Sequence, residues 1–201
     1  MKTSLTWEKR FFKKKFKKIV GLDEVGRGAL AGPIFAAAVI FNLKNIEKNK
    51  KLSEIKDSKK LSEKQREKLF TLIKKNCLVW AVAKVREKQI DRIGIGRANQ
   101  LVFEKLIKRI NPEIILADGQ IFLKSQPRHY YPVIKGDEKV FSIAAASILA
   151  KVSRDRWMIK MDKKYPNYNF KKHKGYGTKA HYLALKKNGP CPCHRLSFRL
   201  K

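Results

Sequence analysis

The chain has 201 residues, of which 48 are lysine or arginine and 17 are aspartate or glutamate, so its net charge is +31. Such an excess of positive charge suits a polyanionic partner, and nucleic acid is the first candidate. The longest apolar run, residues 29–41, is too short to span a membrane, and no apolar signal segment follows the basic N-terminus. We therefore expect a soluble, cytoplasmic protein of one domain, with or without a small appendage.

The N-terminal half predicts three strands and one helix. Residues 1–17 are aromatic and basic and form either a short helix or a mobile arm. Two apolar runs, 19–24 and 34–41, predict strands that are buried on both faces. Residues 42–56 are polar and predict a surface loop, and a capping box at Ser62 and Gln65 begins a helix that reaches about Lys75. A third strand is expected over residues 77–85.

The C-terminal half alternates helices with short strands. A helix is expected over residues 95–110 and is ended by Asn111 and Pro112, and strands follow at 114–117 and 131–134. Residues 140–162 predict a long helix with a small, apolar first half that suits close packing on a sheet. A last helix over 178–187 is stopped at Gly189 and Pro190. The fold class is therefore α/β, with a mixed sheet flanked by helices and an α-helical C-terminal extension.

Carboxylates stand beside glycines at the ends of these elements. Asp23 and Glu24 end the first strand, Asp118 ends the 114–117 strand, and Asp137 precedes the long helix. Gathered in a fold, such carboxylates form a site for hard cations such as Mg²⁺ or Mn²⁺. Adjacent strand residues point to opposite faces, so Glu24 can join Asp23 only if the strand ends or twists there.

These motifs resemble bacterial ribonuclease HII, the type 2 ribonuclease H family. The matching segments are GLDEVGRGALAGP (21–33), DSKKLS (57–62), LADG (116–119), GDEKVFSIAAASILAKVSRDR (136–156), HKGYGT (173–178) and HRLSF (194–198). The resemblance implies a ribonuclease H-like catalytic domain over residues 18–162 and a helical C-terminal extension over 163–201 that contributes to substrate binding. It does not cover the basic N-terminal arm, residues 1–17.

The resemblance also implies an activity. It predicts an endoribonuclease that hydrolyses the RNA strand of RNA–DNA hybrids and cuts on the 5′ side of single ribonucleotides in duplex DNA, leaving 3′-hydroxyl and 5′-phosphate ends. Asp23, Glu24, Asp118 and Asp137 match the family's catalytic and metal-binding acids, with two Mg²⁺ or Mn²⁺ ions in the active complex. Ribonucleotide excision repair and DNA replication are the processes that such an activity would serve.

Substrate recognition is expected in three further places. The family's reader of the ribose 2′-hydroxyl matches the loop of Gly26, Arg27 and Gly28 together with Tyr176. A lysine near the substrate phosphates matches Lys59 or Lys60. The alternatives are a core aromatic residue for Tyr176 and a solvated turn for the lysines. Basic residues from Arg154 onward, among them Arg156, Lys160 and those of 163–172, predict a face that holds duplex phosphates.

Two other classes of protein compete with this hypothesis. An inert nucleic-acid binder is disfavoured, because clustered acids repel phosphate. The type 3 branch of the family usually carries an extra N-terminal domain, for which there is no room before Lys18. The expected partners are RNA–DNA hybrids and DNA duplexes that contain ribonucleotides, bound by a monomer, and the C-terminus shows no clear sliding-clamp peptide.

The cysteines and histidines are expected to have no catalytic role. Cys191, Cys193 and His194 suggest a zinc site, but no second Cys/His cluster completes it and the spacing is not Cys-x2-Cys. Only three cysteines are present, which is typical of a reducing compartment. We expect incidental thiols, and we expect His129, His181 and His194 to be structural or surface residues.

Overall fold

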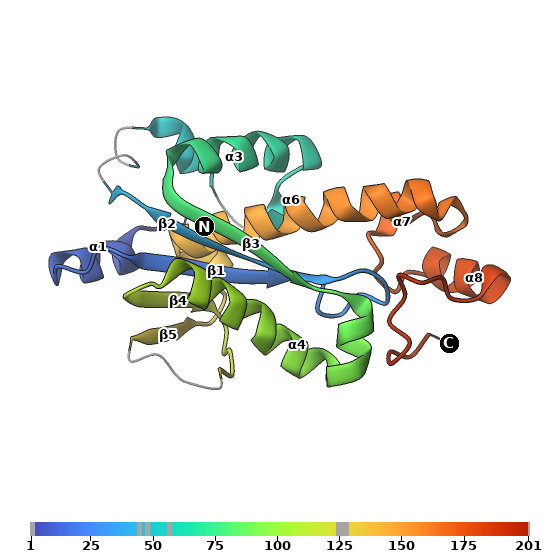
Figure 1. Ribbon diagram of the computed structural model, residues 1–201. Helices are drawn as coiled ribbons and strands as arrows, with labels where there is room; N and C mark the ends of the chain where they lie inside the picture. Colours follow the sequence, from blue (N-terminus) through green and yellow to red (C-terminus); the bar gives the residue numbers. More distant parts are fainter. Residues whose placement is uncertain (1–2, 44–45, 47–48, 56–57, 124–128, 201) are drawn as a thin grey trace.

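A five-stranded mixed sheet forms the centre of the computed structural model, which describes residues 3–43, 46, 49–55, 58–123 and 129–200 (Figure 1). The strand order is β3-β2-β1-β4-β5. Strand β2 is antiparallel to both β1 and β3, whereas β4 runs parallel to both β1 and β5. The strands are β1 (Ile19–Val25), β2 (Ile34–Phe41), β3 (Cys77–Val85), β4 (Ile114–Asp118) and β5 (Tyr130–Val133).

Helices cover both faces of this sheet. They are α1 (Thr6–Lys13), α3 (Glu63–Asn76), α4 (Glu87–Ile110), α5 (Gly136–Lys139), α6 (Phe141–Lys164), α7 (Phe170–His173) and α8 (Lys179–Asn188). Short 3₁₀ turns lie at η1 (Lys50–Glu54), η2 (Ser58–Lys60) and η3 (Pro166–Tyr168). Among the described residues, no helix is both long enough and apolar enough to cross a bilayer.

The side chains of β2 alternate between the two faces of the sheet, and this explains why helices cover both faces. Ala37 and Val39 pack in the cluster that contains α3 and α6, whereas Ala36 and Ala38 pack in the cluster that contains α4. Successive strand residues face opposite sides, so a continuous apolar run such as β2 needs cover on both sides. The predicted mixed sheet with helices on both faces is confirmed.

Close packing joins β1 to the start of α6. The first half of α6 is small and buried, including residues 144–146. Gly21 of β1 lies so near this helix that an added Cβ would be 2.2 Å from the carbonyl carbon of Ser142. A glycine at this position therefore lets the helix that follows Asp137 approach the strand that carries Asp23.

The predicted surface loop over 42–56 was wrong in part. Leu43, Ile46, Leu52 and Ile55 are buried and pack in the core cluster of α3 and α6. These apolar residues are spaced among lysines and asparagines, so an average over the segment hides them. A 3₁₀ turn, η1, presents Leu52 to the core.

The predicted helix over 95–110 is confirmed as the segment after a kink, and a further helical segment precedes it. The helical range α4 begins at Glu87, and Gly94, with a non-helical φ of 76° and ψ of 158°, separates its two segments. Ile90 is buried before this kink, because the first turns already pack on the sheet. The segment before the kink is therefore helical because its apolar face is buried, whereas Gly94 itself leaves the helical conformation.

The N-terminal arm forms a helix, one of the two alternatives. In α1, Glu8 and Phe11 are buried, and Ser4 forms a bridge with Val140. A carboxylate oxygen of Glu8 accepts a hydrogen bond of 2.8 Å from the backbone N–H of Ser142. Burial raises the pKa of Glu8, with hydrogen bonds from Ser142 opposing the shift. The arm therefore packs against the first turn of α6.

Candidate active site

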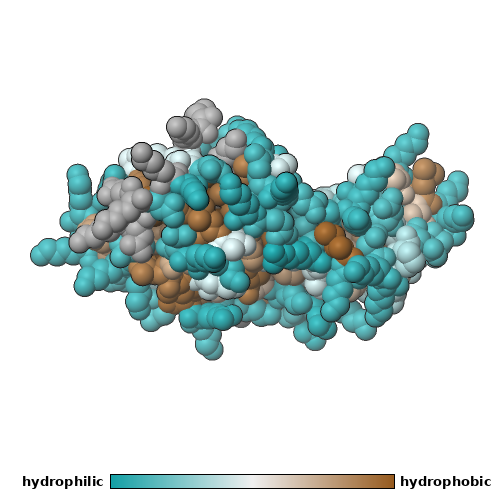
Figure 2. Space-filling view, turned by 90° about the horizontal axis from the view of Figure 1, so that it is seen from above, coloured by the Kyte–Doolittle hydropathy of each residue, from teal (hydrophilic) through white to brown (hydrophobic). Residues whose placement is uncertain are grey.

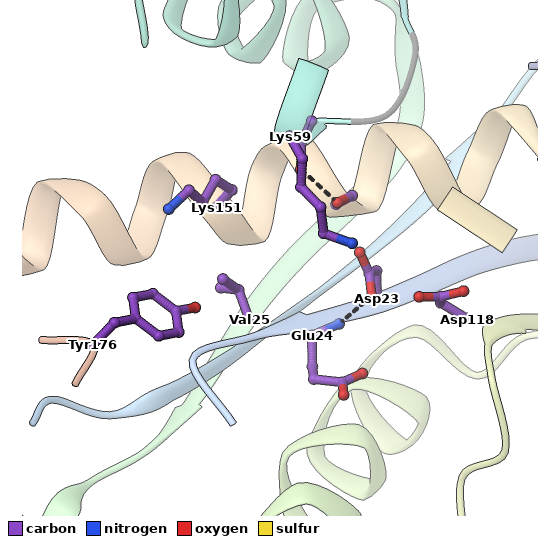
Figure 3. A pocket seen from close by; sticks show the side chains of 9 residues that line it. Asp23, Glu24, Val25, Lys59, Asp118, Lys151 and Tyr176 are labelled. Atoms are coloured by element: carbon purple, nitrogen blue, oxygen red, sulfur yellow. Dashed lines mark hydrogen bonds between the residues drawn. The ribbon is translucent and has the colours of Figure 1, made fainter. Parts of the chain in front are cut away.

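Three carboxylates from separate elements meet beside the central strand. Asp23 lies near the end of β1, Asp118 ends the parallel neighbour β4, and Asp137 lies in α5. One oxygen of each lies within 4.8 Å of the others. The register that pairs Leu22 with Ala117 brings the next residues, Asp23 and Asp118, side by side. Figure 3 shows the carboxylates of Asp23 and Asp118 facing each other.

The carboxylates repel one another in a poorly solvated place. Burial raises the pKa of Asp23 well above its usual value, and the charges of Glu24 and Asp118 raise it further. Burial and then the charge of Asp137 also raise the pKa of Asp118, although the N–H of Gly136 donates a 2.7 Å hydrogen bond to it. Oxygen donors with a surplus of negative charge suit hard divalent cations. The donor set therefore fits Mg²⁺ or Mn²⁺.

Glu24 points away from Asp23. Its side chain leaves the strand on the opposite side, as the alternation of strand residues requires (Figure 3). Its backbone N–H nevertheless donates a 2.7 Å hydrogen bond to Asp23 Oδ1. Burial, and next the charge of Asp118, raises the pKa of Glu24 to about 7. Glu24 thus shares the electrostatic environment of the cluster from the other side of β1.

The two candidate lysines differ in their positions. Lys59 Nζ donates to Asp137 Oδ2 over 3.1 Å and lines the same cavity as Asp23, whereas Lys60 Nζ lies 3.4 Å from Glu138 in an exposed pair. The turn is fixed to α6 by a 2.9 Å contact between the hydroxyls of Ser58 and Ser147. Asp57 of this motif lies outside the described residues. Lys59 therefore reaches Asp137, a member of the carboxylate cluster, whereas Lys60 reaches the neighbouring Glu138.

Tyr176 faces the carboxylates across one cavity. This cavity has a volume of about 420 Å³, and its lining includes Asp23, Glu24, Asp118 and Tyr176. The ring is half-buried, and the guanidinium of Arg154 lies 5.1 Å from its centroid. In Figure 3 the phenol hydroxyl points toward the strand end that bears the acids. The alternative of a core aromatic residue therefore does not describe Tyr176.

Arg195 holds the Gly-Arg-Gly loop, and sequence reasoning missed its role. Its fully buried guanidinium donates to the carbonyl oxygens of Gly26, Arg27 and Gly32 over 2.7, 2.9 and 2.9 Å. The HRLSF motif contains Arg195, but a contact with carbonyls more than 160 positions earlier leaves no local pattern. Gly26 itself has a φ of 90°, and an added Cβ would be 2.2 Å from Arg154 Nε.

The expected phosphate-binding face needs one correction. Arg154 is fully buried and donates to the carbonyl oxygens of Ala31 and Pro33, so it supports the loop from within. Arg156 pairs with Glu67, and Lys160 is exposed. The face seen from above is mostly hydrophilic (Figure 2). Exposed basic residues of α6 remain available to a polyanion at this surface.

The fold and the site together define a class. A mixed five-stranded sheet flanked by helices, with carboxylates gathered near the ends of β1 and β4 beside a helix-borne aspartate, is the arrangement expected of a ribonuclease H-like fold. The family model described as Ribonuclease HII matches residues 20–201. The chain belongs to the ribonuclease HII family. It is therefore a ribonuclease H, an endonuclease that hydrolyses the RNA strand of RNA–DNA hybrids.

Individual relatives agree with this assignment. A ribonuclease HII of Caldicellulosiruptor bescii is 47% identical over 193 residues, covering 95% of this chain and 91% of the relative. One from Pelodictyon phaeoclathratiforme is 46% identical over 185 residues, covering 91% and 90%.

Solved structures share the fold. The ribonuclease H2 of Pyrococcus horikoshii OT3 has a TM-score of 0.74 at 30% identity and covers 91% of this chain and 94% of its own. The RNase HII in a complex with PCNA from Archaeoglobus fulgidus has a TM-score of 0.73 at 28% identity, with coverages of 88% and 91%. Bst-RNase HIII in complex with Mn²⁺ has a TM-score of 0.68 at 22% identity and covers 91% and 67%.

Proposed function

We propose that this ribonuclease also incises duplex DNA on the 5′ side of a single embedded ribonucleotide, leaving 3′-hydroxyl and 5′-phosphate ends. One observation carries the proposal: the acidic cluster and Tyr176 line the same cavity, next to the Gly-Arg-Gly loop. The groups that we expect to cut and the tyrosine that we expect to read the ribose therefore line one cavity. Cellular roles in ribonucleotide excision repair would follow from this activity.

Asp23, Asp118 and Asp137 would hold the divalent ions, and Glu24 would complete the set. Asp23 lies centrally, since its pKa responds to each of the other three acids, and it is our candidate for the shared ligand. When bound, two Mg²⁺ or Mn²⁺ ions would supply the positive charge that offsets the scissile phosphate. Lys59 at 3.1 Å from Asp137 would add a cation beside the same phosphate.

The loop and Tyr176 would recognise the ribose. An added Cβ at Gly28 would meet nothing within 4 Å, so the backbone there is open to a close-approaching ligand. Arg154 and Arg195 keep the loop carbonyls in place, while the Arg154 guanidinium orients the Tyr176 ring. The ribose 2′-hydroxyl is the group that distinguishes RNA from DNA, and these backbone and phenol groups can hydrogen-bond to it.

A labelled DNA duplex with one ribonucleotide tests the proposal when it is incubated with Mg²⁺ or Mn²⁺ and the cut is mapped. A single incision 5′ of the ribonucleotide is expected. Tyr176→Ala should lower this cut by at least about tenfold more than it lowers cleavage of a long hybrid, since one lost recognition contact is worth about 1.4 kcal/mol or more. Tyr182→Phe, on the exposed surface of α8, is the matched control and should behave as wild type.

The possible outcomes separate the components of the proposal. If the wild-type protein cuts only long hybrids, its hydrolysis of hybrids is confirmed. The proposed recognition of a single ribonucleotide in duplex DNA is then rejected. If Tyr176→Ala lowers both activities equally, Tyr176 does not read the junction. If the duplex is bound and neither substrate is cut, an inert binder replaces the enzyme.

A further inference from the structure

A second group of metal-ligating side chains lies in the turn that follows α8. The sulfur atoms of Cys191 and Cys193 are 3.3 Å apart, and a ring nitrogen of His194 lies within 4.8 Å of both. All three side chains are buried. In the sequence, these three residues stand without a second Cys/His cluster. The fold adds a supporting residue, His181, whose ring lies 3.0 Å from that of His194.

The histidines are arranged in one consistent chain of hydrogen bonds. His181 Nδ1–H donates to the carbonyl of Tyr176 over 2.9 Å, which leaves His181 Nε2 to accept over 3.0 Å from His194 Nε2–H. With its proton on Nε2, His194 accepts at Nδ1 from the backbone N–H of Cys191 over 2.9 Å, and this nitrogen also lies 3.2 Å from the carbonyl oxygen of Cys191. His194 therefore turns an unprotonated nitrogen toward the thiols while a second group holds its other nitrogen. Metal-ligating histidines are held in this way.

We propose that Cys191, Cys193 and His194 bind one Zn²⁺ ion, with His181 orienting His194. Thiolate and imidazole donors select Zn²⁺ rather than the hard ions of the acidic cluster. With Zn–S bonds of about 2.3 Å, tetrahedral geometry separates two sulfurs by about 3.8 Å. The observed 3.3 Å separation therefore needs to open by only about 0.5 Å. Binding replaces the Cys191 N–H at Nδ1 and releases the two thiol protons to solvent.

A cavity gives the ion an entry path and room for a solvent molecule as fourth ligand. It has a volume of about 430 Å³, and Pro192, Cys193 and Glu87 are part of its lining. The same lining carries five basic residues, which oppose any cation: Lys84, Arg86, Lys88, Lys160 and Lys164. An ion at this site would therefore be held by its thiolate and imidazole ligands and not by the charge of the lining.

The turn that would bind zinc, residues 191–194, also contacts the end of the loop that begins with Gly-Arg-Gly. The carbonyl of Cys193 accepts the N–H of Gly32 over 2.8 Å, and the next residues lead to Arg195. An ion that stiffens this turn would therefore stiffen the loop. This consequence rests on the proposed function of the loop, whereas the binding of Zn²⁺ does not.

Metal titration of the purified, reduced full chain tests the site. After chelator treatment, Co²⁺ should give an intense sulfur-to-metal absorption band with a stoichiometry of one ion per chain, and Zn²⁺ should displace it. Cys191→Ser and Cys193→Ser should lose the band, whereas Cys77→Ser, in a separate and partly exposed position, should keep it. His181→Gln should weaken Zn²⁺ binding by about 10- to 100-fold.

Asp23→Asn is the control for the other metal site and should leave the absorption band unchanged. A folded wild-type protein without a thiolate band overturns the proposal, and so does thiol titration that finds Cys191 and Cys193 joined as a disulfide in the freshly purified protein. If Zn²⁺ binds but cleavage of the single-ribonucleotide duplex is the same with and without it, the site stands and its coupling to the loop is rejected.

Discussion

The contact of Gly21 with α6 makes a sharp prediction. In Gly21→Ala the new Cβ would lie 2.2 Å from the carbonyl carbon of Ser142, 2.5 Å from its oxygen and 2.6 Å from the nitrogen of Ile143. All three are backbone atoms, so no side-chain rotation relieves the clash. Ordinary contact begins at 3.4 Å, so β1 and the start of α6 must separate by about 1.2 Å.

The expected cost has two parts. Overpacking of this kind costs about 1–3 kcal/mol of folding free energy, and a clash with backbone belongs at the upper end of that range. The same displacement moves Asp23 on β1 relative to Asp137, which lies just before α6. A misplacement of about 1 Å in a catalytic centre can cost on the order of 100-fold in rate. We therefore expect a larger loss of activity than of stability.

Urea denaturation and steady-state cleavage of a long hybrid at saturating Mg²⁺ measure both parts. The matched control is Gly96→Ala on α4, where an added Cβ meets nothing within 4 Å. This control should keep its activity and gain up to about 1 kcal/mol of stability, because alanine favours the helix. Wild-type stability and rate in Gly21→Ala would refute the described approach of α6 to β1.

Three other substitutions test separate features of the structure. Asp137→Asn should abolish cleavage while hybrid binding in a gel-shift assay persists; wild-type turnover would reject its role as a metal ligand. Arg195→Met removes the buried donor of three loop carbonyls. Because each unpaired buried group costs about 1–3 kcal/mol, the free energy of unfolding measured with urea should fall by at least about 3 kcal/mol. A fall of less than about 1 kcal/mol would contradict the described hydrogen bonds. Burial raises the pKa of Glu8, so the stability that its carboxyl provides is full below the unfolded pKa and is lost as pH rises through the folded pKa. Glu8→Gln should therefore gain in Tm relative to wild type as pH rises from about 4 to about 8, and a constant difference would show that Glu8 does not titrate as described.

The strands and the start of α3 could be predicted from the sequence, because each of them carries its own apolar pattern or capping residues. Residues 34–41 and 77–85 are strands with the expected bounds, and the capping box of Ser62 and Gln65 begins α3. Three of the four acids also met as expected, namely Asp23, Asp118 and Asp137, because Asp23 lies near the end of β1 and Asp118 ends its parallel neighbour β4, whereas Glu24 points away. The catalytic and substrate-binding roles of the site residues remain predictions.

Local sequence patterns could not predict contacts between residues that are far apart in the chain. Residues 87–93 are helical because Ile90 packs on the sheet, and the helix propensities of the segment do not reveal this contact. Arg195 binds backbone carbonyls, and a carbonyl is present at every residue, so the sequence carries no complementary side chain to mark the contact. The approach of His181 to His194 likewise depends on how α8 packs against the turn after it.

The loop at residues 26–32 is held by Arg154, by the carbonyl of Gly175, by the carbonyl of Cys193 and by the guanidinium of Arg195, all more than 120 positions later in the chain. Contacts between residues so far apart form slowly, because the entropy of closing a long stretch of chain is lost before the contact is gained. We therefore expect this loop to become ordered late in folding, after local elements such as α3 and the hairpin of β1 and β2.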